Sequence, residues 1–236
     1  QVIETAHRVR GICGQIWCFA VAQGHCERDI TADLRGALTP VKPVHMAAVT
    51  SEAELAGVLR AIDGYDGSFI VQAALKLLPM LLCRPGELRS MRWEDIEDGV
   101  WRFAASKTGQ PHQVALPTQA LAILETVKPV TGNGPYVFPT PRALDGTRPL
   151  SENVFGAALK RMDIRNQTAH GFRASFSTFA NESGLWNADA IERALAHVEA
   201  NDVRRAYVRG EHWDERVRMA AWWAAQLEEM KAQAGM

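Results

Sequence analysis

Two arginines and a histidine in this sequence have the properties of a phosphate-binding site. A phosphodiester can be broken without a metal by a nucleophile, donors that hold the non-bridging oxygens, and an acid that protonates the leaving 5′ hydroxyl. Arginine suits the second part because its planar guanidinium donates two parallel hydrogen bonds and stays charged. Arg84 precedes Pro85 at a predicted helix start. His170 and Arg173 are three residues apart on another predicted helix, so one phosphate could meet both.

Three further residues could supply the acid, another phosphate contact and the nucleophile. Lys107 lies in the polar stretch SKTGQPH, where a hairpin turn could reach into a minor groove and donate a proton. His197 follows the apolar Leu195 and can point from a packed helix toward the same pocket. Tyr207 comes ten residues later on a predicted helix of its own, and tyrosine is a known covalent nucleophile. Its attack would leave a 3′ phosphotyrosine that conserves the bond energy for rejoining.

The N-terminal part reads as the end of an all-α unit. Apolar residues recur at helical spacing from Glu4 to Ala22, and the stretch ERDITADLRGAL predicts a further helix. The next residues, TPVKPVHMAAVT, carry two prolines and no helical period, which predicts an extended connector. We therefore expect a domain boundary near Pro40, with residues 1–38 and 39–236 on either side.

The second part predicts a mainly α fold with a small antiparallel β-sheet. Strands are expected at residues 100–105 and 113–116, with Lys107 in the turn between them, and a long surface loop at residues 131–149. The remaining helices are expected at residues 51–62, 68–82 and 117–127 and at the segments that begin with Ser151, Thr168 and Asp189. The last helix has an apolar stripe, which comprises Trp213, Val217, Ala220, Ala221, Ala224 and Leu227.

Composition excludes little but limits the partners. The formal net charge of −1 gives no bulk attraction to nucleic acid, so a DNA site must be a local basic patch. An arginine run near the C-terminus, interleaved with acidic residues, favours a solvated helix face; it comprises Arg204, Arg205, Arg209, Arg216 and Arg218.

The four cysteines form no CxxC pair, which predicts reduced thiols and no metal site. No segment is typical of a signal peptide or a membrane span, so we expect a cytoplasmic protein. The first residue is Gln, which suggests a fragment or a processed product.

Each candidate residue alone is weak evidence, but their order is specific. The segments CRPGEL, SKTGQPHQVALP, AHGFRASFSTFANE and LAHVEANDVRRAY carry, in that order, the residues Arg84, Lys107, His170, Arg173, His197 and Tyr207. This series resembles the active-site series of tyrosine recombinases over nearly the whole chain, and most closely that of phage-satellite and genomic-island integrases. Leu82 and Cys83 depart from the Thr-Gly pair that many members carry before the first arginine.

The resemblance implies a role for each residue. The two arginines and His197 would bind the scissile phosphate, Lys107 would be the general acid, His170 would assist proton transfer and Tyr207 would attack. Glu87 matches the family glutamate that supports the first arginine. The implied fold is the tyrosine recombinase catalytic fold, preceded in residues 1–38 by the last helices of a truncated core-binding domain.

The resemblance also implies the partners of the reaction. These are double-stranded DNA attachment sites, a homo-tetramer on DNA with a monomer when free, and DNA-bending accessory proteins, with no cofactor and no membrane. The expected function is integration and excision of a mobile element. The C-terminal helix could dock on a neighbouring protomer or pack on its own domain, and the sequence leaves both open.

Two alternative functions stay open. A type IB topoisomerase would share the tyrosine and the phosphate clamp, but it relaxes supercoils without paired specific sites. A DNA-binding regulator with a decayed site would need none of the chemistry, and the complete set of six residues argues against it.

Overall fold

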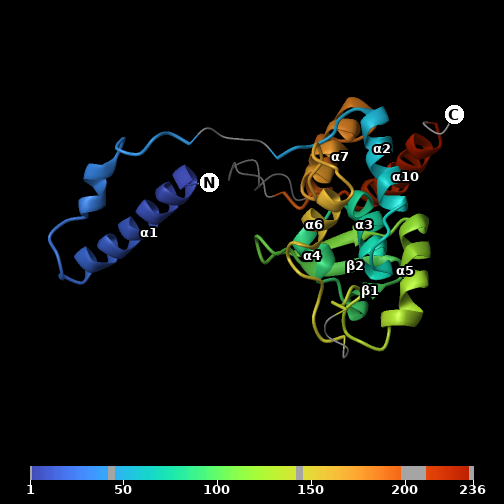
Figure 1. Ribbon diagram of the computed structural model, residues 1–236, viewed down its shortest axis with the longest axis horizontal. Coiled ribbons are helices and arrows are strands. Elements are labelled where there is room, and N and C mark those ends of the chain that lie inside the picture. The colour runs from blue at the N-terminus through green and yellow to red at the C-terminus, as the bar shows by residue number, and fades with distance from the viewer. Residues whose placement is uncertain (1, 42–45, 142–145, 198–210, 234–236) are drawn as a thin grey trace. The chain divides into compact units, whose positions relative to one another are not determined.

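The computed structural model describes residues 2–41, 46–141, 146–197 and 211–233 and divides the chain into two compact units (Figure 1). One unit is Gln1–His45 and the other is Met46–Met236. Among the described helices, none has both the length and the apolar character that crossing a bilayer requires. The fold class predicted from the sequence is confirmed, because the described residues form many helices and one antiparallel sheet.

The N-terminal unit contains one long helix and one short turn of 3-10 helix. Helix α1 (Val2–Ala22) matches the predicted helix, but it buries no residue, and Phe19 is 65% exposed. The expected second helix is wrong, since only η1 (Ile30–Leu34) forms there. Asp29 caps this turn by accepting hydrogen bonds from the backbone and the hydroxyl of Thr31, and Gly36 adopts a left-handed conformation two residues after it ends. These local preferences leave room for a single turn.

The C-terminal unit starts with two helices whose first residues the sequence signals. Helix α2 (Glu52–Asp63) begins after Ser51, whose hydroxyl accepts a hydrogen bond from the backbone of Glu54. Helix α3 (Phe69–Leu81) follows Ser68 and is buried along nearly its whole length. It ends where Leu82 turns into the left-handed region at φ 58°. That turn leads to the short helix α4 (Pro85–Arg89), which has proline at its first position.

A three-stranded antiparallel sheet comes next, in the order β1, β2, β3. The predicted hairpin is β2 (Val100–Ala104) paired with β3 (Pro111–Ala115), with Phe103 opposite His112. Strand β1 (Ile96–Glu97) was not predicted, because its two residues are too few for a period, and it follows the 3-10 turn η2 (Trp93–Asp95). The third strand also begins at Pro111 and not at Gln113, which shortens the turn that carries Lys107.

Helices α5 (Thr118–Thr131), α6 (Val154–Arg161), α7 (Gly171–Glu182) and α8 (Ala188–Ala194) complete most of the unit. Helix α5 continues beyond the predicted end at Val127, because the hydroxyl of Thr131 bonds the carbonyl oxygens of Val127 and Val137. Helix α6 begins after Asn153, three residues later than expected from Ser151.

The last helix, α10 (Trp213–Gln233), packs on α2 and α3 of its own unit, and Figure 1 shows α2 and α10 side by side. The predicted apolar stripe is confirmed at Ala224 and Leu227, which are buried, but it is wrong at Val217, which is 40% exposed. Met219 and Trp223, which were not predicted, are buried. The reason is a specific polar contact: the indole N–H of Trp223 donates to the carbonyl oxygen of Pro79, 2.7 Å away. Pro79 lies in the last turn of α3, where carbonyl oxygens have no partner in the helix.

The prediction that the C-terminal arginine run is a solvated face is wrong for Arg216. This side chain is buried, donates to the carbonyl oxygen of Gln113 on β3, and lies over the ring of Trp213 with 5.4 Å between the guanidinium carbon and the ring centroid. The run is interrupted here because position 216 falls on the inner face of α10. Arg204, Arg205 and Arg209 lie outside the described residues.

Candidate active site

Arg84 is held at the entrance of α4 by contacts from two directions. It is the N-cap residue of that helix, and Pro85 fixes the backbone that follows it. Its Nη1 lies 3.0 Å from Oε1 of Glu87, and its Nη2 donates to the carbonyl oxygen of Ala196, 3.2 Å away. The side chain is 15% exposed, so the guanidinium is fixed in place but still open to a ligand.

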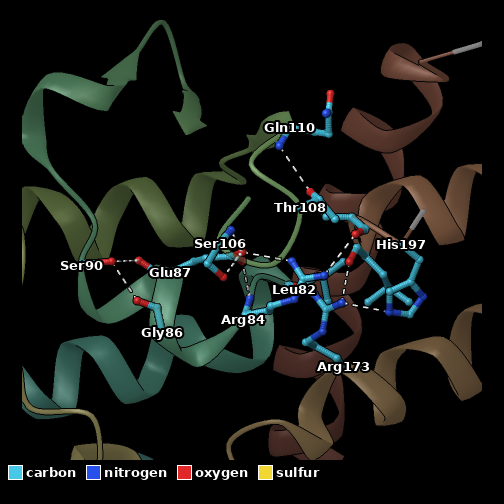
Figure 2. A network of polar contacts seen from close by, with 12 residues as sticks. Leu82, Arg84, Gly86, Glu87, Ser90, Ser106, Thr108, Gln110, Arg173 and His197 are labelled. Carbon is cyan, nitrogen blue, oxygen red and sulfur yellow. Dashed lines mark hydrogen bonds and ion pairs between the residues drawn. The ribbon is translucent and has the colours of Figure 1, made fainter. Parts of the chain in front are cut away.

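The carboxylate of Glu87 accepts hydrogen bonds from both Arg84 and Ser106. One carboxylate oxygen accepts from the backbone N–H of Arg84 at 2.8 Å, and the other accepts from the backbone N–H and hydroxyl of Ser106, each at 2.9 Å (Figure 2). Burial by itself would raise the pKa of Glu87, but the hydrogen bonds from Arg84 and Ser106 outweigh it and lower the pKa. The carboxylate therefore stays charged opposite Arg84.

The hairpin turn that carries Lys107 is joined to this carboxylate through the preceding residue, Ser106. Ala105 closes the turn by donating to the carbonyl oxygen of Gln110 at 2.8 Å and by accepting from Thr108 and Gly109. Gly109 has φ 68°, a conformation that favours glycine. Lys107 is exposed in the turn, as the sequence predicted, and within the described residues its ammonium group has no hydrogen-bond partner.

Arg173 is buried in the first turn of α7, where two carbonyl oxygens from distant segments receive its guanidinium. Nη1 donates to Leu82 at the end of α3, and Nη2 donates to Leu195 at the end of α8. Within the described part of the chain its Nε is buried without a partner. Burial, followed by the charge of Arg84, lowers the pKa of Arg173 from its ordinary value.

His170 lies one residue before α7 and not inside it, so the prediction that it shares the helix with Arg173 needs correction. The helix starts at Gly171, whose N–H donates to the hydroxyl of Thr168 at 2.9 Å. Thr168 therefore lies two residues before the N-cap, and the predicted cap is wrong in position, although its hydroxyl accepts from the first N–H of the helix. The His170 side chain is exposed at the N-cap position.

His197 follows α8 and contacts the second arginine, Arg173. Its Nε2 lies 3.0 Å from Nη2 of Arg173, and its Nδ1 lies 2.8 Å from a carboxylate oxygen of Glu192. Arginine can only donate, so Nε2 accepts and the proton is on Nδ1 in this arrangement. Ala196, with φ 50°, turns the chain so that the carbonyl oxygens at the end of α8 face both guanidinium groups.

Electrostatics also links these residues. Partial desolvation of the His170 ring, whose residue is exposed overall, lowers its pKa first, and the charges of Arg173, Arg84, His197 and Lys107 lower it further. A neutral imidazole at this position can accept a proton. The structure thus brings together five of the six residues that the sequence singled out, whereas Tyr207 lies outside the described residues.

Sequence reasoning missed Ser106, Glu192 and His112. His112 faces inward from β3, where its ring meets Phe103 edge-on, and burial followed by the charge of Arg216 lowers its pKa from 6.5 to about 4. Alternation with the buried Val114 on the same strand was a usable signal for His112. Ser106 and Glu192 could not be found in that way, because their roles depend on which side chains the fold places beside them.

Within the described residues no three His, Cys, Asp or Glu side chains come together in a way that could hold a metal ion. The cysteine beside the first arginine, Cys83, is buried, and this burial raises the pKa of its thiol. Cys83 is therefore a packing residue here and not a ligand.

The fold and these sequence segments have known counterparts. The chain is 21% identical to a lambda integrase (75-356) dimer bound to a COC' core site, with a TM-score of 0.63, covering 84% of this chain and 73% of that one. The lambda integrase tetramer bound to a Holliday junction gives a TM-score of 0.61 at 21% identity, covering 82% and 58%. At this identity the likeness shows the fold, which is that of tyrosine recombinase catalytic domains.

Sequence comparison gives the family. The phage integrase family matches residues 49–212, and the phage integrase central domain matches residues 1–37. The integrase of Enterobacteria phage P4 is 33% identical over 245 residues, which cover 95% of this chain and 55% of that protein. The chain belongs to the phage integrase family. It spans little more than half the length of this relative.

Proposed function

We propose that this chain is the catalytic part of a site-specific DNA recombinase that cleaves and rejoins DNA through a 3′ phosphotyrosine at Tyr207. Residues 39–236 form the catalytic domain in this proposal, and residues 1–38 end a core-binding domain. The observation that supports it best is the meeting of Arg84 and Arg173 at the end of α8, where the carbonyl oxygens of Ala196 and Leu195 hold them beside His197. Such a cluster of fixed donors suits one phosphate.

In the cleavage step the phenolic oxygen of Tyr207 attacks the scissile phosphorus. A P–O bond to tyrosine forms, the bond to the 5′ oxygen breaks, and that oxygen takes a proton from the ammonium of Lys107. The phenolic proton passes to the neutral imidazole of His170, whose lowered pKa keeps it available as an acceptor. The reverse sequence rejoins the strand, because the phosphotyrosine keeps the bond energy.

The two arginines stabilise the charge that develops on the non-bridging oxygens. The carbonyl oxygens of Leu82 and Leu195 already hold Arg173 on one edge, so its buried Nε, unpaired among the described residues, remains to donate. His197 lies against Nη2 of Arg173, and Glu192 on its Nδ1 fixes the orientation of the ring beside the phosphate site.

The substrate class and assembly follow from the same proposal. Double-stranded attachment sites are the DNA partners, and a homo-tetramer carries out exchange in the cytoplasm with DNA-bending accessory proteins. The lambda integrase structures, on a core site as a dimer and on a Holliday junction as a tetramer, support this by analogy. Integration and excision of a mobile element is the resulting function.

Covalent trapping tests the reaction class. The protein is incubated with a nicked suicide duplex of its attachment site and denatured, and a DNA-linked band is sought on a gel. The band is expected with the parent protein and absent with Tyr207→Phe. A band of equal intensity in the variant would refute Tyr207 as the nucleophile.

The phosphate clamp has its own test. Arg173→Lys keeps the charge but loses the planar fork, so cleavage is expected to fall about a hundredfold. The rate of covalent complex formation at saturating DNA measures this. An unaltered rate would show that Arg173 does not bind the reacting phosphate.

A further inference from the structure

We infer that Ser106 is a positioning residue that fixes Lys107 relative to Arg84 by hydrogen bonding to Glu87. The inference rests on the proposed role of Lys107 as general acid. It adds a residue to the site that neither the sequence pattern nor the family match assigns.

The hydroxyl and the backbone N–H of Ser106 bond the same oxygen of Glu87, each at 2.9 Å. The same oxygen lies 3.0 Å from Nη1 of Arg84. Glu87 is only 5% exposed, so its carboxylate depends chiefly on donors from the protein, and the exposed Ser106 supplies two of them. Oε1 of Glu87 therefore accepts hydrogen bonds from both Arg84 and Ser106, the residue before Lys107.

These bonds are what ties the hairpin turn to the rest of the site. Within the described residues, the other hydrogen bonds of residues 106–109 stay inside the hairpin, where Ala105 and Gln110 supply the partners (Figure 2). The side chain of Lys107 makes none there. The placement of Lys107 consequently depends on the neighbouring residue.

The hydroxyl of Ser106 can be removed by substitution while its backbone N–H stays in place. Any residue except proline could donate the backbone N–H at position 106, but the second donor here is a hydroxyl on Cβ, which Thr shares with Ser and Ala lacks. Removing it leaves Oε1 of Glu87 with two of its three donors and frees the turn to move away from Arg84. A small displacement of a general acid is enough to slow proton transfer.

The test compares two substrates in the chain with Ser106→Ala, Ser106→Thr and Lys107→Ala. One substrate is the suicide duplex, and the other carries a 5′-bridging phosphorothiolate, whose thiolate leaves without protonation. Ser106→Ala is expected to slow cleavage of ordinary DNA about tenfold to a hundredfold, and to slow the thiolate substrate less than about threefold. Ser106→Thr is expected to restore the rate on ordinary DNA.

Thr108→Ala is the matched control, because in the described part of the chain its hydroxyl bonds Gln110 within the same turn and no residue of the site. It is expected to leave both rates unchanged. Thermal unfolding of every variant checks that each one is folded.

The outcomes are distinct. If Lys107→Ala loses both substrates equally, the general-acid role fails and the inference falls with it. If Lys107→Ala is rescued by the thiolate but Ser106→Ala loses both substrates equally, Ser106 acts on stability or on Arg84, and the inference is overturned while the acid role stands. An unchanged rate on ordinary DNA in Ser106→Ala would overturn it as well.

Discussion

Replacing Glu87 by Gln should destabilise the C-terminal unit by about 3–4 kcal/mol. The amide keeps one acceptor oxygen for Ser106 and Arg84 but presents an NH₂ group to the backbone N–H of Arg84, which now donates to a carboxylate oxygen at 2.8 Å. A hydrogen bond to a charged group contributes about 1.5–3 kcal/mol. Breaking a buried ion pair costs about 3–5 kcal/mol, and the Arg84–Glu87 pair is 15% and 3% exposed. The two costs overlap, so they are not summed.

Thermal unfolding monitored by circular dichroism measures this loss. At about 2–4 °C per kcal/mol for a unit of this size, the Tm should fall by roughly 6–16 °C. The pKa of Glu87 is lowered below 4.5, so its contribution is present above that pH and disappears as the pH falls through the folded-state value. The advantage of the parent over Glu87→Gln should therefore shrink in acid.

Glu152→Gln is the matched control for this prediction. Glu152 pairs with Arg89 at 3.2 Å, but its side chain is 84% exposed, so its loss should cost less than about 1 kcal/mol. A loss for Glu87→Gln no larger than that, or one that is equal at neutral and acid pH, would refute the reasoning about the buried carboxylate.

Three further substitutions probe other parts of the fold. The pKa of His112 is lowered from 6.5 to about 4, so as the pH falls the unfolded chain takes up the proton before the folded chain does. The free energy of unfolding should therefore decrease by up to about 3 kcal/mol as the pH falls from 6.5 to about 4. Urea titrations at several pH values should show a weaker pH dependence in His112→Gln. Trp223→Phe leaves the carbonyl oxygen of Pro79 without its donor and opens a void, which should cost about 2–4 kcal/mol by urea denaturation. Gly171→Ala would put a methyl group against the carbonyl oxygen of Ala47, which should cost about 1–3 kcal/mol by thermal unfolding.

Each of these has a control in the same chain. His25 is exposed, so His25→Gln should leave the pH curve unchanged. Trp222 is half-buried, and Trp222→Phe should cost less than Trp223→Phe. Gly57 lies inside α2 with nothing within 4 Å of an added methyl, so Gly57→Ala should stabilise by about 0.5–1 kcal/mol. Equal effects of a substitution and its control would contradict the corresponding assignment.

Local signals in the sequence predicted the elements that position the site. Ser51 before α2, Pro85 at the start of α4 and the Gly109 turn each act within a few residues, so their effects can be read without the fold. The order of the candidate residues predicted which side chains would meet. Arg84, Arg173 and His197 meet at the end of α8, and His170 senses their charges and that of Lys107. The catalytic roles of these residues and of Tyr207 remain predictions.

The contacts that refine the site are non-local, and sequence reasoning could not reach them. Arg173 is fixed by the carbonyl oxygens of Leu82 and Leu195, which no side-chain pattern encodes because they belong to the backbone. The buried face of α10 was predicted only in part for a similar reason: Met219 and Trp223 lie outside the predicted stripe, and the indole of Trp223 bonds the backbone carbonyl oxygen of Pro79.

The packing of α2 against α10 has a consequence for synthesis on the ribosome. The ion pair between Asp63 and Lys231, at 3.1 Å, joins the first helix of the C-terminal unit to the last. A nascent chain that has already exposed Arg84 and Arg173 must therefore wait for α10 to leave the exit tunnel before its apolar core can close. Until α10 has been synthesised, the faces of α2 and α3 that it covers stay open, so a nascent chain that stops before α10 exposes apolar surface to proteases.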